Sequence, residues 1–321
     1  ELTGGLMDLV LLGLGLAGLV FGGDMLVRGA SDLARRAGLP PLVIGLTLVG
    51  FGTSTPELVT SLQAAYLGSP GIAVGNVVGS NIANILMILG AAAVLAPIAI
   101  DKTAFRRDGL VLALSTLLCA VMILYGQLTP MFGAVFILAL LAYLGFTVWS
   151  GLKTPQAAGE APDDAAQDTA LIPVWRDIAF FVGGLVLTIL GARFFVTGAI
   201  SVAEFLGVSE AVIGLTVVAV GTSLPELVTT LAAARRKQAD IAFGNIVGSN
   251  IFNVLFILGA TALVNPIEVP RSIQSFDVWV MCAVTALLLV FSVTRWRISR
   301  IEGGVFLLAY AGYIGWLALG A

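Results

Sequence analysis

Residues Gly45–Gly90 read GLTLVGFGTSTPELVTSLQAAYLGSPGIAVGNVVGSNIANILMILG, and residues Gly214–Gly259 read GLTVVAVGTSLPELVTTLAAARRKQADIAFGNIVGSNIFNVLFILG. The two segments align without a gap at a constant offset of 169 residues, and 29 of 46 positions are identical. Each segment contains one glutamate, Glu57 or Glu226, in an otherwise apolar stretch. A duplicated apolar segment with one acid per copy predicts a site that two halves of a membrane protein share.

The composition of the whole chain agrees with a membrane protein. Mean hydropathy is +1.04, 59% of the 321 residues are hydrophobic and 11% are charged. Soluble domains carry about 25% charged residues. Apolar runs long enough to cross a bilayer core of about 30 Å recur from one end of the chain to the other. We therefore predict an all-α integral membrane protein without a sizeable soluble domain.

The hydropathy pattern predicts ten transmembrane helices, five in each half of the chain. The expected spans are Met7–Leu26, Leu42–Leu67, Ile72–Leu95, Gly109–Tyr125 and Pro130–Trp149, then Ile178–Val196, Ala211–Ala234, Ile241–Val264, Val278–Val293 and Gly303–Leu319. Residues 1–150 form the first repeat, with its motif at 45–90, and residues 176–321 form the second, with its motif at 214–259. Residues 151–175 are polar, acidic and rich in Pro and Ala, which is typical of a flexible linker.

The basic residues predict the orientation. If the loop after the first span is cytoplasmic, fourteen of the sixteen Lys and Arg residues lie on the cytoplasmic side, and only Arg193 and Arg271 lie elsewhere. This asymmetry predicts that both termini are outside and the central linker is inside. Because five spans per half is an odd number, the second repeat enters the membrane with the opposite orientation. The halves are therefore expected to be inverted repeats.

The motif GTSxPE combines a helix break with an acid. Proline inside a helix removes a backbone donor and clashes with the carbonyl four residues earlier, so Pro56 frees the carbonyl of Gly52, and Pro225 does the same in the second copy. Freed carbonyls inside a bilayer must find a partner or line a cavity. A hard cation is a suitable partner, and the glutamate that follows adds charge and oxygen ligands. An acid at mid-span indicates a functional site.

The motif GNxxGSNxxN supplies polar side chains at helical spacing. Asn76, Ser80 and Asn84 are four residues apart and form one stripe on a helix, whereas Asn81 lies about a quarter-turn away. Such a stripe taken alone indicates helix packing or interhelical hydrogen bonds. Its repetition beside a pair of glutamates favours a role in the shared site.

Oxygen and charge counting favour Ca²⁺ as the ion. Two ionised glutamates neutralise one divalent cation, and two bidentate carboxylates with the carbonyls of Thr53 and Thr222 supply six oxygens, the lower end for Ca²⁺. The chain has no His, and neither Cys119 nor Cys282 is near the motifs, which argues against Zn²⁺ and Cu²⁺. Mg²⁺ would require a stricter octahedron with retained waters.

The paired GTSxPE and GNxxGSNxxN motifs resemble the repeats of the cation/calcium antiporter superfamily, and especially its prokaryotic sodium/calcium exchanger branch. The resemblance implies exchange of Ca²⁺ against about three Na⁺ by alternating access, with Met7–Leu26 and Ile178–Val196 as the helices that slide. It implies central ligands at Glu57 and Glu226. The implied flanking ligands are Thr53, Ser54, Ser80, Asn84, Thr222, Ser223, Ser249 and Asn253, with the carbonyls of Gly50 and Ala219 in the Na⁺ sites.

Two differences from other branches of the superfamily indicate which ion is exchanged for Ca²⁺. Potassium-dependent relatives use an aspartate where Asn84 or Asn253 stands, so the resemblance implies K⁺-independent exchange. Proton-coupled relatives resemble a GNxxE pattern in the first motif, so GTSxPE favours Na⁺. A H⁺/Ca²⁺ antiporter remains the alternative, because a carboxylate also carries a proton. A Ca²⁺ channel would need several acids around a symmetric pore, which one chain does not supply.

The resulting expectation is an antiporter and not an enzyme, with Ca²⁺ and Na⁺ as transported substrates and no cofactor. The site carries no net charge with Ca²⁺ and +1 with three Na⁺, whereas the empty site carries −2 and is costly to bury. Transport is therefore expected to be electrogenic. The expected surroundings are the lipid bilayer of a bacterial inner membrane. No nucleic-acid partner is expected, and a monomer is compatible with the pattern.

Overall fold

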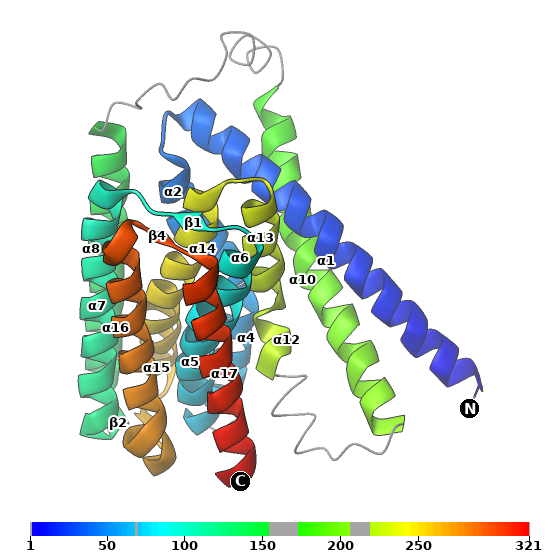
Figure 1. Ribbon diagram of the computed structural model, residues 1–321. Coiled ribbons are helices and arrows are strands. Elements are labelled where there is room, and N and C mark those ends of the chain that lie inside the picture. The colour runs from blue at the N-terminus through cyan, green and yellow to red at the C-terminus, as the bar shows by residue number, and fades with distance from the viewer. Residues whose placement is uncertain (1, 68–69, 154–172, 206–218, 321) are drawn as a thin grey trace.

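The computed structural model describes residues 2–67, 70–153, 173–205 and 219–320, and these residues are almost entirely helical. Figure 1 shows an upright bundle, with two long helices, α1 and α10, crossing it obliquely at one side. The elements of the first half are α1 (Leu2–Ala37), α2 (Pro41–Ile44), η1 (Gly45–Val49), α3 (Gly50–Thr53), α4 (Thr55–Tyr66), α5 (Pro70–Ala83), η2 (Asn84–Leu89), α6 (Gly90–Leu95), β1 (Ile98–Ala99), α7 (Lys102–Tyr125), β2 (Gln127–Leu128) and α8 (Pro130–Lys153).

The described part of the second half follows a similar order, with a π-helical segment, η5, before α16. Its elements are α10 (Val174–Phe205), α12 (Ala219–Thr222), α13 (Leu224–Arg235), α14 (Ala239–Phe252), η4 (Asn253–Leu258), α15 (Gly259–Val264), β3 (Ile267–Glu268), η5 (Ile273–Asp277), α16 (Val278–Arg295), β4 (Arg297–Ile298) and α17 (Arg300–Gly320). The segments labelled η are π-helical turns inside longer helices. Such turns occur frequently at functional sites.

Helices α1 and α10 pack against each other in antiparallel directions with their backbones in contact. Gly15 faces Phe195, Gly22 faces Thr188 and Gly29 faces Phe181. Residue numbers rise along α1 while those of their partners on α10 fall, as in an antiparallel pair. A Cβ atom at Gly22 would lie 2.5 Å from Thr188 Oγ1 and 2.6 Å from its backbone nitrogen. Only glycine permits this approach, as in other small-residue helix interfaces in membranes.

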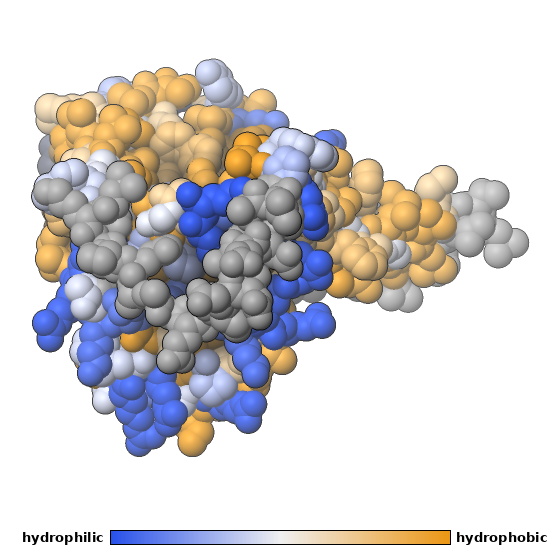
Figure 2. All heavy atoms as spheres, turned by 90° about the horizontal axis from the view of Figure 1, so that it is seen from above, coloured by the Kyte–Doolittle hydropathy of each residue, from blue (hydrophilic) through white to orange (hydrophobic). Residues whose placement is uncertain are grey.

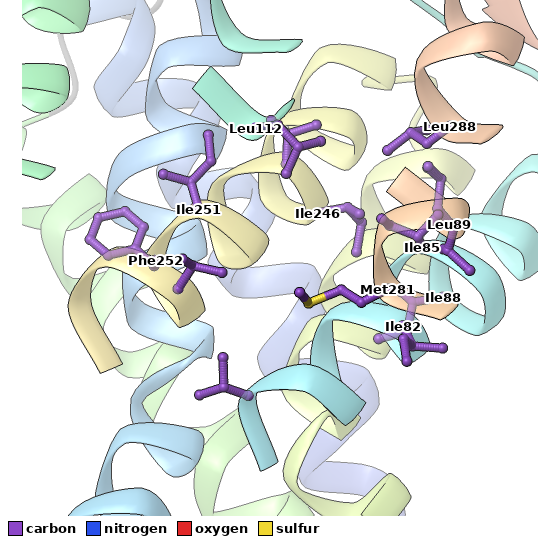
Figure 3. Close-up of a cluster of buried hydrophobic side chains, with 14 of the residues drawn as sticks. Ile82, Ile85, Ile88, Leu89, Leu112, Ile246, Ile251, Phe252, Met281 and Leu288 are labelled. Carbon is purple, nitrogen blue, oxygen red and sulfur yellow. The ribbon is translucent and has the colours of Figure 1, made fainter. Parts of the chain in front are cut away.

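The core of the bundle is formed by both copies of the duplicated segment. Ile85, Ile88 and Leu89 of η2 pack with Ile246 and Ile251 of α14 in one cluster of buried side chains (Figure 3). Helices α7 and α16 close the cluster with Leu112, Met281 and Leu288. These apolar contacts hold α5 and α14 together around the polar motifs that the same helices carry.

Two short antiparallel strand pairs join the halves. β1 pairs with β4, with Ile98 opposite Ile298, and β2 pairs with β3, with Leu128 opposite Ile267. Figure 1 places the β1–β4 pair at the upper end of the bundle and β2 at the lower end. Each pair combines one strand from each half. The pairs satisfy backbone groups at the loops and link the two halves at both ends.

An Asp–Tyr hydrogen bond joins the last two long helices in each half. Tyr143 of α8 donates to Asp108 of α7 at 3.2 Å, and Tyr313 of α17 donates to Asp277, which ends η5, at 2.9 Å. Arg107 also donates two hydrogen bonds to Asp108, at 2.7 and 2.8 Å. A buried carboxylate requires such donors. The sequence analysis did not identify these pairs.

Among the described residues, seven helices are long and apolar enough to cross a membrane, and eight if the bent pair Pro41–Thr53 and Thr55–Tyr66 counts as one span. The chain is a multi-pass membrane protein by this measure. The count of ten stays a prediction, and the expected span Ala211–Ala234 lies partly outside the described residues. The expected linker 151–175 also lies mostly outside them.

The first span continues beyond its predicted end at Leu26, because α1 reaches Ala37. The charged residues that end the apolar run pair with each other on the helix, as Arg28 does with Asp24 at 3.0 Å and Arg35 does with Asp32. Hydrophilic side chains gather on the upper end of the molecule (Figure 2), whereas the long helices expose large apolar side chains such as Phe21, Leu117 and Leu138. This distribution is what a bilayer around the flanks requires.

Candidate functional site

Each GTSxPE motif breaks its helix at the serine. α3 ends at Thr53 and α4 begins at Thr55, with a bend of 44° between the two helical segments. In the second half α12 ends at Thr222 and α13 begins at Leu224, and Ser54 and Ser223 have matching backbone angles. The break predicted from Pro56 and Pro225 is confirmed. It places the glutamate of each motif in the first turn of a new helix, where the helix dipole favours a negative charge.

The two glutamates are buried and connected through serines of the opposite halves. Glu57 and Glu226 are each 1% exposed. Ser223 donates to Glu57 Oε1 at 3.1 Å, and Ser54 donates to Glu226 Oε1 at 2.9 Å. Because each serine directly precedes the helix that carries its own half's glutamate, the two crossed hydrogen bonds bring both carboxyl groups to one place.

Two asparagines add oxygen atoms from the neighbouring helices. Asn84 begins η2 and Asn253 begins η4, and both are 1% exposed. Their Nδ2 atoms donate to Asn250 Oδ1 at 3.0 Å and to Asn81 Oδ1 at 2.9 Å. Both Asn84 and Asn253 therefore use their amide nitrogens in contacts with the opposite half.

Four buried oxygens of these residues lack a hydrogen-bond partner within the described part of the chain. They are Glu57 Oε2, Glu226 Oε2, Asn84 Oδ1 and Asn253 Oδ1. Buried polar atoms without partners are rare and costly, so each requires an explanation. An all-oxygen set with carboxylate and amide donors is the chemistry that hard cations prefer.

The remaining predicted site residues lie around the same two breaks. Thr53 Oγ1 lies 3.0 Å from the Val49 carbonyl and 3.1 Å from Asn245 Oδ1. Ser249 donates to the Gly50 carbonyl at 3.3 Å, which joins two candidate ligands of opposite halves. Ser80 is buried, and Ala219 is the first residue of α12.

Asn76 uses its place on the predicted polar stripe for interhelical hydrogen bonds. Its amide donates to the backbone carbonyl of Glu57 at 3.1 Å and to Ser61 at 3.0 Å, and thus fixes the first turn of α4. Asn245 makes the equivalent contacts with Glu226 at 3.4 Å and with Thr230 at 2.9 Å. The sequence analysis missed Ser61 and Thr230, although a hydroxyl at the same position of both motifs was a usable signal.

A cavity of about 440 Å³ is lined by residues of both breaks, at one side of the bundle. We call it the α4–α10 cavity, and it is lined by Thr55, Pro56, Val59, Thr60, Gln63, Ile189, Ala192, Arg193, Val196, Thr197, Gly221 and Thr222. Two of the positions 169 residues away from this lining, Gly23 and Thr229, are tightly packed. Gly23 packs so tightly on α13 that a Cβ atom would lie 2.7 Å from Val228, and Thr229 is fully buried. The two halves therefore differ in packing at these positions.

Comparisons with known proteins agree with this architecture. The profile of the family described as sodium/calcium exchanger protein matches residues 7–149 and 177–319. The chain is 38% identical over 321 residues to the inner membrane protein YrbG of Escherichia coli, covering 98% of this chain and 97% of that protein. It is 36% identical to the sodium/calcium exchanger MaX1 of Methanosarcina acetivorans, covering 96% of this chain and 97% of that protein.

The fold is also similar to a solved structure. The sodium-calcium exchanger NCX_Mj, in crystals soaked with Na⁺ and Sr²⁺, superposes with a TM-score of 0.84 at 33% identity, covering 97% of this chain and 98% of that one. The family profile matches most of the chain in two blocks, one for each half. The chain therefore belongs to the sodium/calcium exchanger family of cation/Ca²⁺ antiporters.

Proposed function

We propose that this protein exchanges Na⁺ for Ca²⁺ by alternating access at one site between Glu57 and Glu226. The observation that carries the proposal is the set of four partnerless, buried oxygens, two from each half of the chain. A bound cation would satisfy all four. The names of MaX1 and NCX_Mj as sodium/calcium exchangers support the same pair of ions.

Ca²⁺ is expected to take oxygen ligands from both breaks. Glu57 and Glu226 supply the charge, and the carbonyls of Thr53 and Thr222 bring the count to six, within the range of Ca²⁺. Three Na⁺ would spread over the same region. They would use the side chains of Ser54, Ser80, Ser223 and Ser249 and the carbonyls of Gly50 and Ala219, whereas the amide oxygens of Asn84 and Asn253 would serve either ion. Several of these groups, such as Ser249 and Gly50, bond to each other and would separate to admit an ion.

The charge of the site favours exchange over leak. With both acids ionised, the site carries −2 when empty, 0 with Ca²⁺ and +1 with three Na⁺. Enclosing two carboxylates without a cation in a low-dielectric bundle is strongly unfavourable, so the site changes sides only when it holds ions. Each cycle then moves one net positive charge, worth about 2.3 kcal/mol per 100 mV of membrane potential. Transport is electrogenic at this stoichiometry.

Access alternates because the two halves are inverted repeats of five helices each. The reciprocal hydrogen bonds support this arrangement, since Ser54 with Glu226 and Ser223 with Glu57 are related by the offset of 169. Helices α1 and α10 slide across the bundle, which closes the site to one side of the membrane and opens it to the other. With both termini outside, as the basic residues predict, the α4–α10 cavity faces the extracellular side.

The test is Na⁺-gradient-driven uptake of ⁴⁵Ca²⁺ into proteoliposomes that contain purified protein. Glu57→Gln removes one of two site charges and is expected to abolish uptake, and Glu226→Gln is expected to do the same. Glu302→Gln is the matched control, because Glu302 only accepts hydrogen bonds from the N–H and hydroxyl of Ser299 at the start of α17, away from the two breaks. Full activity of Glu57→Gln would overturn the assignment. Uptake driven by a pH gradient without Na⁺ would show proton coupling, and a requirement for K⁺ would contradict K⁺-independent exchange.

A further inference from the structure

We propose that Asn81 and Asn250 are positioning residues that turn the amide oxygens of Asn253 and Asn84 toward the transported ion. This inference rests on the proposed function, since it takes the partnerless oxygens as ion ligands. Asn81 and Asn250 themselves use both ends of their amides in protein hydrogen bonds. They therefore act through their neighbours and not as ligands.

The orientation of the Asn81 amide is fixed by a backbone carbonyl. Asn81 Nδ2 lies 3.3 Å from the carbonyl oxygen of Asn250. A carbonyl oxygen only accepts hydrogen bonds, so the atom that faces it must be the amide nitrogen. This contact removes the usual ambiguity between the nitrogen and oxygen of an amide. Asn81 Oδ1 then occupies the other end of the group.

The fixed oxygen of Asn81 orients the next amide in the chain of contacts. Asn253 Nδ2 donates to Asn81 Oδ1 at 2.9 Å. The oxygen of Asn253 is consequently directed away from Asn81, and it is one of the four partnerless atoms. An oxygen in this orientation attracts a cation, whereas an amide nitrogen in its place would repel one.

The second half contains the same arrangement. Asn250 Nδ2 faces the Asn81 carbonyl at 3.4 Å, and Asn250 Oδ1 accepts from Asn84 Nδ2 at 3.0 Å. Asn84 Oδ1 is left without a partner. Each positioning residue thus orients the amide of the opposite half, and the ion site is ordered only when α5 and α14 are in register.

One neighbour of the Asn81 amide belongs to the apolar cluster. Its amide nitrogen lies 4.0 Å from the sulfur of Met281, and Figure 3 shows Met281 beside Ile82 in the apolar cluster. Without Asn81, the Asn253 amide would lose its acceptor and the constraint that presents its oxygen. Removing a residue that orients a metal ligand typically weakens metal affinity about 10- to 100-fold.

The experiment is a double-mutant cycle on Asn81→Leu and Asn253→Leu, measured as Na⁺-driven ⁴⁵Ca²⁺ uptake in proteoliposomes. Asn81→Leu is expected to raise KM for Ca²⁺ about 10- to 100-fold, with the maximal rate changed by less than about threefold. The double variant is expected to have the KM of Asn253→Leu alone, because Asn81 acts only through Asn253. An unchanged KM in Asn81→Leu, or single effects that multiply in the double variant, would overturn the inference.

Two further variants separate this inference from folding defects. Asn81→Ser removes the amide without added bulk and replaces the leucine variant in the cycle if that variant does not reach the membrane. Thr261→Val is the control, because Thr261 is buried in α15 and its hydroxyl donates to the Ile257 carbonyl of its own helix turn. Its KM is expected to match the wild type. Absence of Na⁺-driven uptake in the wild type would contradict the proposed function itself, whereas an active wild type with unaltered KM in Asn81→Ser refutes only the positioning role.

Discussion

Replacing Asp24 with asparagine is expected to increase the population of the opposite access state. Asp24 on α1 accepts a hydrogen bond from Arg236, which follows α13, at 2.6 Å and pairs with Arg28 at 3.0 Å. The Asp24–Arg236 pair therefore crosses the interface between a sliding helix and the bundle. At an offset of 169, Asp24 corresponds to Arg193 and Arg236 corresponds to Leu67, so the other half cannot form the equivalent pair.

The size of the effect follows from this asymmetry. Two identical inverted halves would make the two access states equal in free energy, so a contact without a counterpart stabilises only the state in which it forms. The side chains of Asp24 and Arg236 are 39% and 28% exposed, and solvent screens their attraction. Such a pair contributes about 0.2–1 kcal/mol. Its loss is expected to raise the ratio of the opposite state to this one about 1.5- to 5-fold.

The assay measures how fast a buried position becomes accessible. Thr229 corresponds to Thr60 of the α4–α10 cavity but is fully buried, so a cysteine at 229 reacts only in the opposite state. In a background without Cys119 and Cys282, we expect Asp24→Asn to speed labelling of Thr229→Cys about 1.5- to 5-fold when a membrane-impermeant reagent is added on the cytoplasmic side, to which the opposite state opens.

The matched control for this prediction is Asp32→Asn. Asp32 pairs with Arg35 on the same helix, so this change removes an ion pair of α1 that does not cross the interface. High salt should reduce the difference between wild type and Asp24→Asn, because it screens exposed charges. Equal labelling rates in wild type and Asp24→Asn at low salt, or slower labelling in the variant, would refute the reasoning.

Three further predictions concern packing, a buried hydrogen bond and the site charge. Gly184→Leu is expected to abolish ⁴⁵Ca²⁺ uptake. A Cβ at Gly184 would lie 2.3 Å from the Leu26 nitrogen, so a leucine there prevents the close packing of α10 on α1. Tyr143→Phe is expected to lower the free energy of unfolding by about 1.5–3 kcal/mol, seen as a lower melting temperature in detergent, because a buried carboxylate loses a donor. Asn253→Asp is expected to reduce Na⁺-driven Ca²⁺ uptake at least about tenfold, since it adds a buried charge and removes a hydrogen-bond donor; wild-type rates would contradict it.

The local features of the site could be predicted from the sequence. A proline breaks its helix through its own ring, and an acid in an apolar run requires a partner wherever the run packs. The breaks at Ser54 and Ser223 and the burial of Glu57 and Glu226 follow from these facts, and the structure confirms them. The duplication itself indicated that equivalent residues of both halves would meet.

Only the tertiary structure decided which atoms remain free and which residues hold them. Helical periodicity placed Asn76 on one stripe with Ser80 and Asn84, but it did not show that the Asn76 amide bonds to the Glu57 backbone or that Asn81, outside this stripe, contacts Asn253. Periodicity gives the angle of a side chain around its own helix and says nothing about the atom it meets on another. The contacts that define this site join residues about 170 positions apart, so their partners are set by how the two halves pack.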